Sequence, residues 1–176
     1  MQIRTATIKD ILNIANLHAE SWRDNYHPVL TDEYLNVIVF NERTQAWTER
    51  LENPTENQLV LVAEVDGAFS GFICAYGAND PQYGTIVDNL HVMPNIKGQG
   101  IGSALLGAVA KWAKENYQEH GLYLEVLECN PKAIAFYEHL GANRAKIAYW
   151  HTPCDTQAKE YFYCWYSLDE LIKRTI

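Results

Sequence analysis

The stretch LHVMPNIKGQGIGS, from Leu90 to Ser103, decides the fold that we predict for this chain. It begins as the end of an apolar strand and breaks at Pro94 and Asn95, which are common turn residues. Three glycines follow at alternate positions, and an apolar-periodic run starts at Ala104. A strand, a glycine-rich loop and a helix start in this order gather backbone N–H groups at the positive end of a helix. The stretch therefore predicts a binding site for a phosphate or pyrophosphate group.

The spacing of these glycines argues against the two commonest nucleotide-binding loops. A Walker A loop needs G-x-x-x-x-G-K-[ST], and the chain has no such pattern. A dinucleotide-binding fingerprint needs G-x-G-x-x-G, whereas Gly98, Gly100 and Gly102 are spaced G-x-G-x-G and follow the first half of the chain. Taken alone, the triplet is equally consistent with a simple turn that joins a strand to a helix.

The composition is that of a globular protein with an acidic balance. Fourteen lysines and arginines stand against 22 aspartates and glutamates, a formal net charge of −8. This balance argues against nucleic-acid binding and mildly favours a cationic substrate such as an amine, although solubility is a sufficient reason for it. The N-terminus has no apolar signal segment, and no apolar run is long enough to span a membrane. The four cysteines match no zinc-binding spacing, so we expect reduced thiols, no metal and a cytoplasmic location.

Hydrophobic periodicity predicts a mixed α/β sheet in a single domain, residues 1–176. The expected strands are 2–5, 59–65, 68–76, 85–93, 122–127, 144–150 and 161–168. The expected helices are 8–22, 31–52 (split near Asn41), 102–117 and a short one that opens at Asn130-Pro131 and stops at Gly141. Asp66-Gly67 predicts a hairpin, and the helix at 102–117 makes the strands on either side of it parallel.

Two motifs together resemble those of the GCN5-related N-acetyltransferases, the GNAT family. The acetyl-CoA loop of that family has the pattern [QR]-x-x-G-x-[GA] after a strand ending V-x-P. Here it is VMPNIKGQGIGSALL, with Lys97 at the first position of the pattern. The second motif of the family is present as LEVLECNPKAIAFYEHLGA, residues 124–142. The resemblance implies a sheet of about seven strands with a V-shaped splay between the fourth and fifth strands, flanked by about four helices.

The resemblance also implies an activity. The chain is expected to transfer an acetyl group from acetyl-CoA, as co-substrate, to a primary amine of a small molecule, protein or peptide by direct attack in a ternary complex. Neither nucleic acid nor membrane is expected as a partner, and the chain is expected to be a monomer or a homodimer. The alternative is a non-catalytic coenzyme-A-binding sensor or regulatory module.

The family motifs match a set of positions for coenzyme A. The loop should hold the pyrophosphate, the strand before it should pair with the pantetheine arm, and an asparagine should bond that arm. Lys97 is equally consistent with a solvated side chain, and Asn130 with a helix N-cap. The implied residues are Leu90, His91, Val92, Lys97, Gly98, Gln99, Gly100, Ile101, Gly102, Ser103 and Asn130.

The catalytic candidates are one tyrosine and two carboxylates. Tyr137 matches the family tyrosine that protonates the leaving thiolate, and its alternative role is core packing beside Phe136. The attacking amine must lose a proton. Asp88 is the first candidate base, because aminoglycoside 6′-acetyltransferases, a branch of the family, have an aspartate at this offset from the loop. A substrate-binding or structural role for Asp88 is equally open, and Glu125 is the reserve base.

Substrate recognition is expected in the segments that follow the family pattern least. These are the segment 22–35 and the loops 77–84 and 151–159. The first of them is rich in aromatic residues, which are equally consistent with core packing. Its candidate substrate-binding residues are Trp22, Tyr26 and Tyr34.

Overall fold

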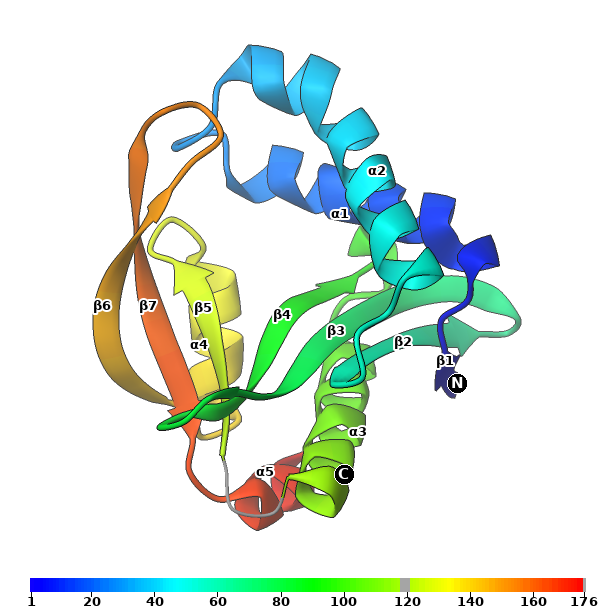
Figure 1. Cartoon of the computed structure of the whole chain (residues 1–176), viewed down its shortest axis with the longest axis vertical. Coiled ribbons are helices and arrows are strands. Elements are labelled where there is room, and N and C mark those ends of the chain that lie inside the picture. Colours follow the sequence, from blue (N-terminus) through cyan, green and yellow to red (C-terminus); the bar gives the residue numbers. More distant parts are fainter. Residues whose placement is uncertain (118–120, 176) are drawn as a thin grey trace.

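The computed structural model describes residues 1–117 and 121–175 and contains a twisted seven-stranded sheet with helices on both faces (Figure 1). The strand order is β1-β2-β3-β4-β5-β7-β6. The strands are β1 Gln2–Thr5, β2 Gln58–Val65, β3 Ala68–Asp80, β4 Gly84–Val92, β5 Leu122–Leu127, β6 Asn143–His151 and β7 Gln157–Trp165. Only β4 and β5 pair in parallel; the other neighbours are antiparallel. The predicted mixed sheet is therefore confirmed.

Five α-helices flank this sheet in the described part of the chain. They are α1 Ile11–Asn25, α2 Val39–Glu52, α3 Ile101–Asn116, α4 Pro131–His139 and α5 Leu168–Arg174. A π-helical turn at Tyr34–Ile38 precedes α2, and 3-10 turns at Ile8–Asp10 and Pro94–Ile96 precede α1 and α3. None of the helices described is both long and apolar enough to cross a membrane.

Alternation along the central strands divides the core into two layers. In β2, Val60 and Val62 pack with α1 and α2, whereas Leu61 and Ala63 pack with α3 on the opposite face. Figure 1 shows the same arrangement, with α1 and α2 on one side of β2–β4 and α3 on the other. Because both faces are covered, the strand is apolar at nearly every position, as its sequence indicated.

The parallel pair β4–β5 is very short. Among the residues that the structure describes, its paired positions are Thr85 with Leu122 and Ile86 with Tyr123. Beyond them β4 continues beside β3 to Val92, while β5 continues beside β7 to Leu127. The two strands diverge from this point, which confirms the V-shaped splay between the fourth and fifth strands.

Three stretches differ from the sequence prediction. Asn41 does not split the second helix, because it lies within α2, and the irregular part is the π-helical turn that precedes α2. The expected loop at 77–84 is largely a hairpin, because β3 runs to Asp80 and β4 starts at Gly84. The last strand ends at Trp165, not at Leu168, and a fifth helix follows it. Ser167 starts this helix by accepting a hydrogen bond from the Glu170 N–H at 3.3 Å, an S-x-x-E capping pattern that the strand prediction overlooked.

Candidate active site

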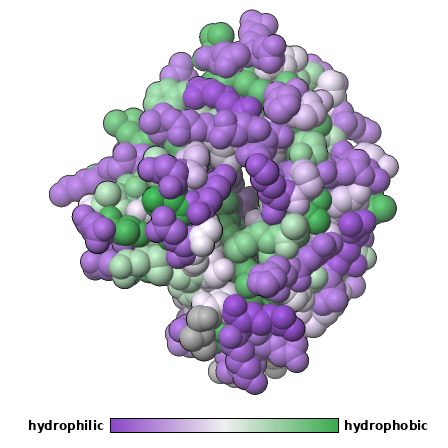
Figure 2. All heavy atoms as spheres, turned by 180° about the vertical axis from the view of Figure 1, so that it is seen from behind, coloured by the Kyte–Doolittle hydropathy of each residue, from purple (hydrophilic) through white to green (hydrophobic). Residues whose placement is uncertain are grey.

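A cavity of about 1050 Å³ lies where β4 and β5 diverge. Residues of α1, α2, β4, the glycine loop, β5, α4 and the β6–β7 connection line it. Seen from behind, the molecule is hollowed near its middle, with hydrophilic side chains above and beside the opening and apolar ones along its lower edge (Figure 2). The cavity therefore brings together both sequence motifs and the ends of elements that are distant in the sequence.

The glycine loop presents unpaired backbone donors to this cavity. Gly98 and Gly100 have φ angles of 82° and 79°, a conformation that favours glycine, and a Cβ on either would meet nothing within 4 Å. The helix ladder of α3 starts with the Ala104 N–H, which donates to the Gly100 carbonyl at 2.9 Å. No side chain caps the helix, so the N–H groups of residues 101–103 have no intrahelical acceptor. They form an open, positive cradle that fits a pyrophosphate.

Most of the predicted loop residues reach the cavity. Lys97, Gly98, Gly100 and residues 101–103 line it, whereas Gln99 is not among its lining residues. Backbone donors alone can serve a phosphate group, so the loop geometry does not depend on the Gln99 side chain.

The edge of β4 that faces β5 carries free backbone groups. The Met93 N–H donates to the Ser70 carbonyl of β3 at 3.0 Å. Alternation along the strand therefore directs the backbone groups of His91 toward β3, and those of Leu90 and Val92 toward the open side. Of the three predicted positions, Leu90 and Val92 thus have backbone groups available to an extended ligand.

A β-bulge changes how the side chains of β4 point. Consecutive residues of β3 pair with Val87 and Asn89, so Asp88 is the extra residue. Arg50 of α2 donates from Nη1 to Asp88 Oδ2 at 2.8 Å and to Asn89 Oδ1 at 2.9 Å. Neighbours on a regular strand point to opposite faces. The extra residue at Asp88 therefore breaks the regular alternation of side chains along β4.

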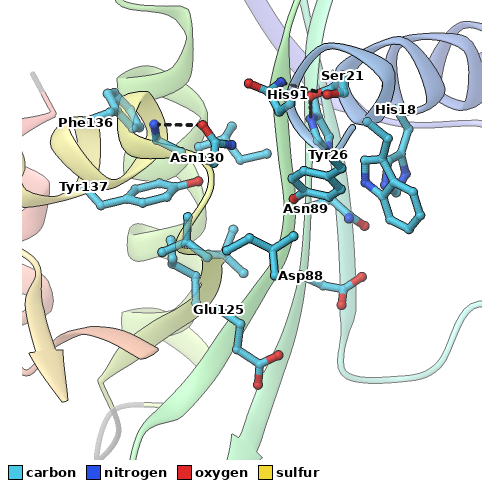
Figure 3. A pocket seen from close by; sticks show the side chains of 18 of the residues that line it. His18, Ser21, Tyr26, Asp88, Asn89, His91, Glu125, Asn130, Phe136 and Tyr137 are labelled. Atoms are coloured by element: carbon cyan, nitrogen blue, oxygen red, sulfur yellow. Dashed lines mark hydrogen bonds between the residues drawn. The ribbon is translucent and has the colours of Figure 1, made fainter. Parts of the chain in front are cut away.

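Helix α4 brings Asn130 and Tyr137 to the cavity. Asn130 caps the helix, because its Oδ1 accepts a hydrogen bond from the Ala133 N–H at 3.3 Å. Tyr137 is 8% exposed, and Figure 3 shows its hydroxyl pointing into the space between α4 and β4. Burial, with a smaller contribution from Tyr26, raises the pKa of Tyr137, so the phenol keeps its proton at neutral pH. Its ring also packs edge-on against Trp165, so the structural and the cavity-facing roles coexist.

Five carboxylates line the cavity, and three of them come from strands. Asp88 of β4 is paired with Arg50, as described. Burial, and then the charge of Asp88, raises the pKa of Glu125 on β5. Burial, and then the charge of Glu125, raises the pKa of Glu160 on β7 to about 7. Figure 3 shows Asp88 and Glu125 on the two strands that border the gap.

Comparison with known proteins gives this arrangement a family. The sequence model of the acetyltransferase (GNAT) family matches residues 13–142. The chain belongs to this family. Membership, together with relatives that are N-acetyltransferases, makes this GNAT protein an acyltransferase.

Three relatives illustrate the similarity. The uncharacterized N-acetyltransferase YuaI of Bacillus subtilis (strain 168) is 27% identical over 148 residues, which are 81% of this chain and 80% of that protein. The N-alpha-acetyltransferase of Sulfurisphaera tokodaii is 39% identical over 96 residues, 49% of this chain and 58% of that protein. The paia N-acetyltransferase of Thermoplasma acidophilum, solved in complex with coenzyme A, has a TM-score of 0.67 at 21% identity and covers 90% of this chain and 96% of that one.

His18 of α1 and His91 of β4 pack against each other in this GNAT protein. The Trp47 indole N–H donates to His18 Nδ1 at 3.0 Å, and His91 Nδ1 lies 2.9 Å from Ser21 Oγ. The two imidazole centroids are 4.8 Å apart. Burial, with a smaller effect of Lys97, lowers the pKa of His91 to about 3, and burial lowers the pKa of His18 well below its ordinary value. Both rings are therefore neutral at physiological pH.

The aromatic residues at the end of α1 divide between the cavity and the core. Trp22 and Tyr26 line the cavity of the acetyltransferase, and their ring centroids are 5.4 Å apart. The structure does not bring Tyr34 to the cavity: it is 4% exposed and packs with Leu35 and Val39 in a separate core cluster. Tyr34 belongs to the π-helical turn, which directs it inward.

The β6–β7 connection bridges to the segment after α1. Thr156 Oγ1 donates to the Val29 carbonyl at 3.3 Å, and the ring centroids of Trp22 and Trp150 are 5.7 Å apart. These contacts join the two sides of the splay at the end of the cavity away from the glycine loop (Figure 1). Two of the segments expected to recognise substrate, 22–35 and 151–159, therefore meet.

Sequence reasoning missed several residues that line the GNAT cavity. Arg50, His18 and Ser21 lie on the inner faces of α1 and α2 and carry no motif. Glu160 falls just before the strand predicted at 161–168, whereas β7 starts at Gln157 and includes it. Only the register of β7 against β5 could have identified Glu160, and a register between distant strands cannot be read from one sequence.

Proposed function

We propose that residues 1–176 act as one N-acetyltransferase unit, which transfers the acetyl group of acetyl-CoA to a primary amine of a small molecule or of a protein or peptide. The observation that carries this proposal is the meeting of three features in one cavity: the uncapped start of α3, the open edge of β4 and the Tyr137 hydroxyl. The coenzyme A in the paia N-acetyltransferase structure, a protein of the same fold, supports it.

The glycine cradle is the proposed pyrophosphate site. Three N–H groups of residues 101–103 and the positive end of the α3 dipole attract a doubly charged anion. Lys97, beside the cradle, adds a positive charge to the same wall of the cavity. The missing Cβ atoms of Gly98 and Gly100 leave room for phosphate oxygens to approach the backbone.

The diverging strands are the proposed site for the pantetheine arm. An extended ligand adds to a sheet edge through backbone hydrogen bonds, and Leu90 and Val92 supply such an edge. Asn130, at the facing end of β5, has amide hydrogens left after capping α4. A backbone N–H of this edge would also polarise the thioester carbonyl at the moment of attack.

Chemistry then follows from the groups around the thioester position. When bound, acetyl-CoA supplies the acetyl group as a reactive thioester. The amine nitrogen attacks the carbonyl carbon, the carbon–sulfur bond breaks, and the Tyr137 phenol donates its proton to the leaving sulfur. Tyr137 suits this role because burial keeps it protonated at neutral pH.

The amine must be deprotonated before it attacks, and carboxylates line this wall. Asp88 and Glu125 are both proposed for this task. The contacts argue against Asp88 as the base, since protonating it would break its 2.8 Å ion pair with Arg50. The Asp88–Arg50 pair is better suited to fixing the shape of the acceptor side, where Trp22 and Tyr26 also lie.

A coenzyme A release assay over a panel of primary amines tests the proposal. We expect turnover with at least one amine, and we expect Tyr137→Phe to lower kcat by about 100-fold without changing the Kd for acetyl-CoA. Tyr166→Phe, the same change at an exposed residue, is the control and should retain wild-type turnover. Tight acetyl-CoA binding without turnover of any amine would favour the sensor or regulatory alternative instead.

A further inference from the structure

Glu160 lies where the acceptor side of the cavity meets the second motif. In the β5–β7 pairing Leu127 faces Glu160 and Glu125 faces Phe162, so the two glutamates are diagonal neighbours on one face. Such neighbours are roughly 7–8 Å apart at their Cα atoms, within reach of two long side chains. Both line the cavity, and Glu160 is partly buried there.

Neither of the two carboxylates forms an ion pair within the described chain, although the charge of Lys146 offsets part of the rise in the pKa of Glu125. Other carboxylates nearby are paired: Glu128 accepts from Lys159 at 2.8 Å, and Asp88 from Arg50. Neither Glu125 nor Glu160 has a salt bridge or a side-chain hydrogen bond among residues 1–117 and 121–175. Two unpaired carboxylates this close repel each other, and either a proton or a bound cation relieves the repulsion.

The charged and titratable groups around Glu160 come from each neighbouring element. Glu125 is its diagonal neighbour on β5, and Tyr26 at the end of α1 is close enough to be affected by its charge. On β6, Ala148 pairs with Glu160 and Lys146 pairs with Phe162. The Lys146 ammonium lies 4.0 Å from the Phe162 ring centroid. Asp88 of β4 is close enough to act on Glu125. The charge that acts on Glu160 directly is that of Glu125, and it disfavours the ionised form of Glu160.

Tyr26 relates this acidic pair to the proposed general acid. Burial is the main reason for the raised pKa of Tyr26, and the charge of Glu160 adds to it. Tyr26 in turn contributes to the raised pKa of Tyr137. Tyr26, Glu160 and Tyr137 also line the same cavity. An amine between Glu160 and the thioester position would have a base on one side and the Tyr137 acid on the other.

We propose that Glu125 and Glu160 together bind the ammonium group of the acceptor and that Glu160, in place of Asp88 or Glu125, takes its proton, an inference that rests on the proposed acetyl transfer. The proton passes from R–NH₃⁺ to the Glu160 carboxylate, and the free amine forms the nitrogen–carbon bond as the carbon–sulfur bond breaks. The sulfur takes the Tyr137 proton, and the second proton of the nitrogen restores Tyr137 through solvent. Glu160 releases its proton to water, so each turnover liberates one proton, one amide and one thiol.

The position of Glu160 matches its task. A carboxylate whose pKa lies near 7 is a stronger base than an ordinary one and is still half ionised at neutral pH. The approach of an ammonium group stabilises the charged form of both glutamates, so binding prepares the base that then accepts the proton.

Kinetics as a function of pH test this inference. The probes are butylamine, ethanolamine and a short peptide with a free amino terminus, and the proteins are wild type, Glu160→Gln, Glu160→Asp, Glu125→Gln and Glu128→Gln. We expect Glu160→Gln to lower kcat/KM for the amine about 100-fold near neutral pH, with an unchanged KM for acetyl-CoA. This deficit should shrink as rising pH supplies free amine, and Glu160→Asp should restore part of the activity. Glu125→Gln should chiefly raise the KM for the amine.

The control and the contrary outcomes separate this inference from the proposed function. Glu128→Gln makes the same change at a carboxylate outside the cavity lining and should keep the wild-type pH profile. An active wild type whose pH profile is unchanged in Glu160→Gln would overturn the role of Glu160 and leave acetyl transfer standing. No turnover of any amine by the wild type would overturn both. A carbon-detected NMR titration, with the Glu160 signal assigned from Glu160→Gln, should show a midpoint near pH 7; a midpoint near 4 would also overturn it.

Discussion

Acid should destabilise this fold through His91. The ring is packed against Phe72, with centroids 5.2 Å apart, and its pKa in the folded protein is about 3, lowered by burial and then by Lys97. In the unfolded chain the pKa returns to about 6.5. Below that value the unfolded state binds a proton that the folded state does not. Stability therefore falls as the pH drops from 6.5 toward 3, and this effect is absent above 6.5.

The size of the effect follows from the two pKa values. Each pH unit between them corresponds to about 1.4 kcal/mol, so at pH 5 the folded state is less stable by about 2 kcal/mol on account of His91. Total stabilities of about 5–15 kcal/mol are usual, so this is a measurable fraction. His18 acts in the same direction, because burial and the nearby His91 lower its pKa too.

Urea unfolding of wild type and His91→Gln, each at pH 7 and pH 5, measures this contribution. Glutamine keeps a hydrogen-bonding group beside Ser21 and does not titrate. Carboxylates titrate in both proteins and cancel in the difference. The wild type should lose about 2 kcal/mol more than the variant between the two pH values.

His27→Gln is the matched control, because His27 is exposed and its environment changes little on unfolding. Its loss of stability between pH 7 and pH 5 should equal that of the wild type. An equal loss in the wild type and His91→Gln would refute the reasoning, since the imidazole would then bind its proton as readily in the folded protein as in the unfolded chain.

Two further predictions concern the donor side of the cavity. Gly100→Ala places a side chain at a φ of 79°, so it should destabilise the protein by about 1–2 kcal/mol in urea unfolding and weaken acetyl-CoA binding by calorimetry, whereas Ala108→Gly within α3 should affect stability alone. Asn130→Ala removes the cap of α4 and should cost about 1 kcal/mol of stability as well as acetyl-CoA affinity; Asn130→Ser, which can still cap, should recover the stability. Unchanged acetyl-CoA affinity in either alanine variant would argue against its part in the binding site.

The donor side of the site could be predicted from the sequence because it is local. The cradle consists of backbone N–H groups from consecutive residues, and glycine spacing, a turn and the start of a helical period reveal such a loop. Asn130 and Tyr137 lie on one short helix, so helical periodicity brings both to the same end of the cavity. The parallel pairing of β4 and β5 could also be predicted, because the crossover helix α3 directly connects these two strands.

The bulge at Asp88 shows where local reasoning fails. Alternation along a strand is a sound rule only while the ladder is regular, and the extra residue resets the phase. Nothing in the residues around Asp88 announces a bulge. Its effect is chemical, because it lets Asp88 and Asn89 share the guanidinium of Arg50, which arrives from a helix about forty positions earlier.

The acceptor side of the cavity, unlike the donor side, depends on long-range packing. Its side chains come from α1, α2, β5 and β7, and each is placed by the register of one element against another. A slip of one residue in β7 would move Glu160 to the opposite face and away from Glu125, while leaving the glycine cradle untouched. Acceptor preference can therefore change through strand register alone, which makes the β5–β7 pairing the place to look for differences among GNAT relatives that have the same loop.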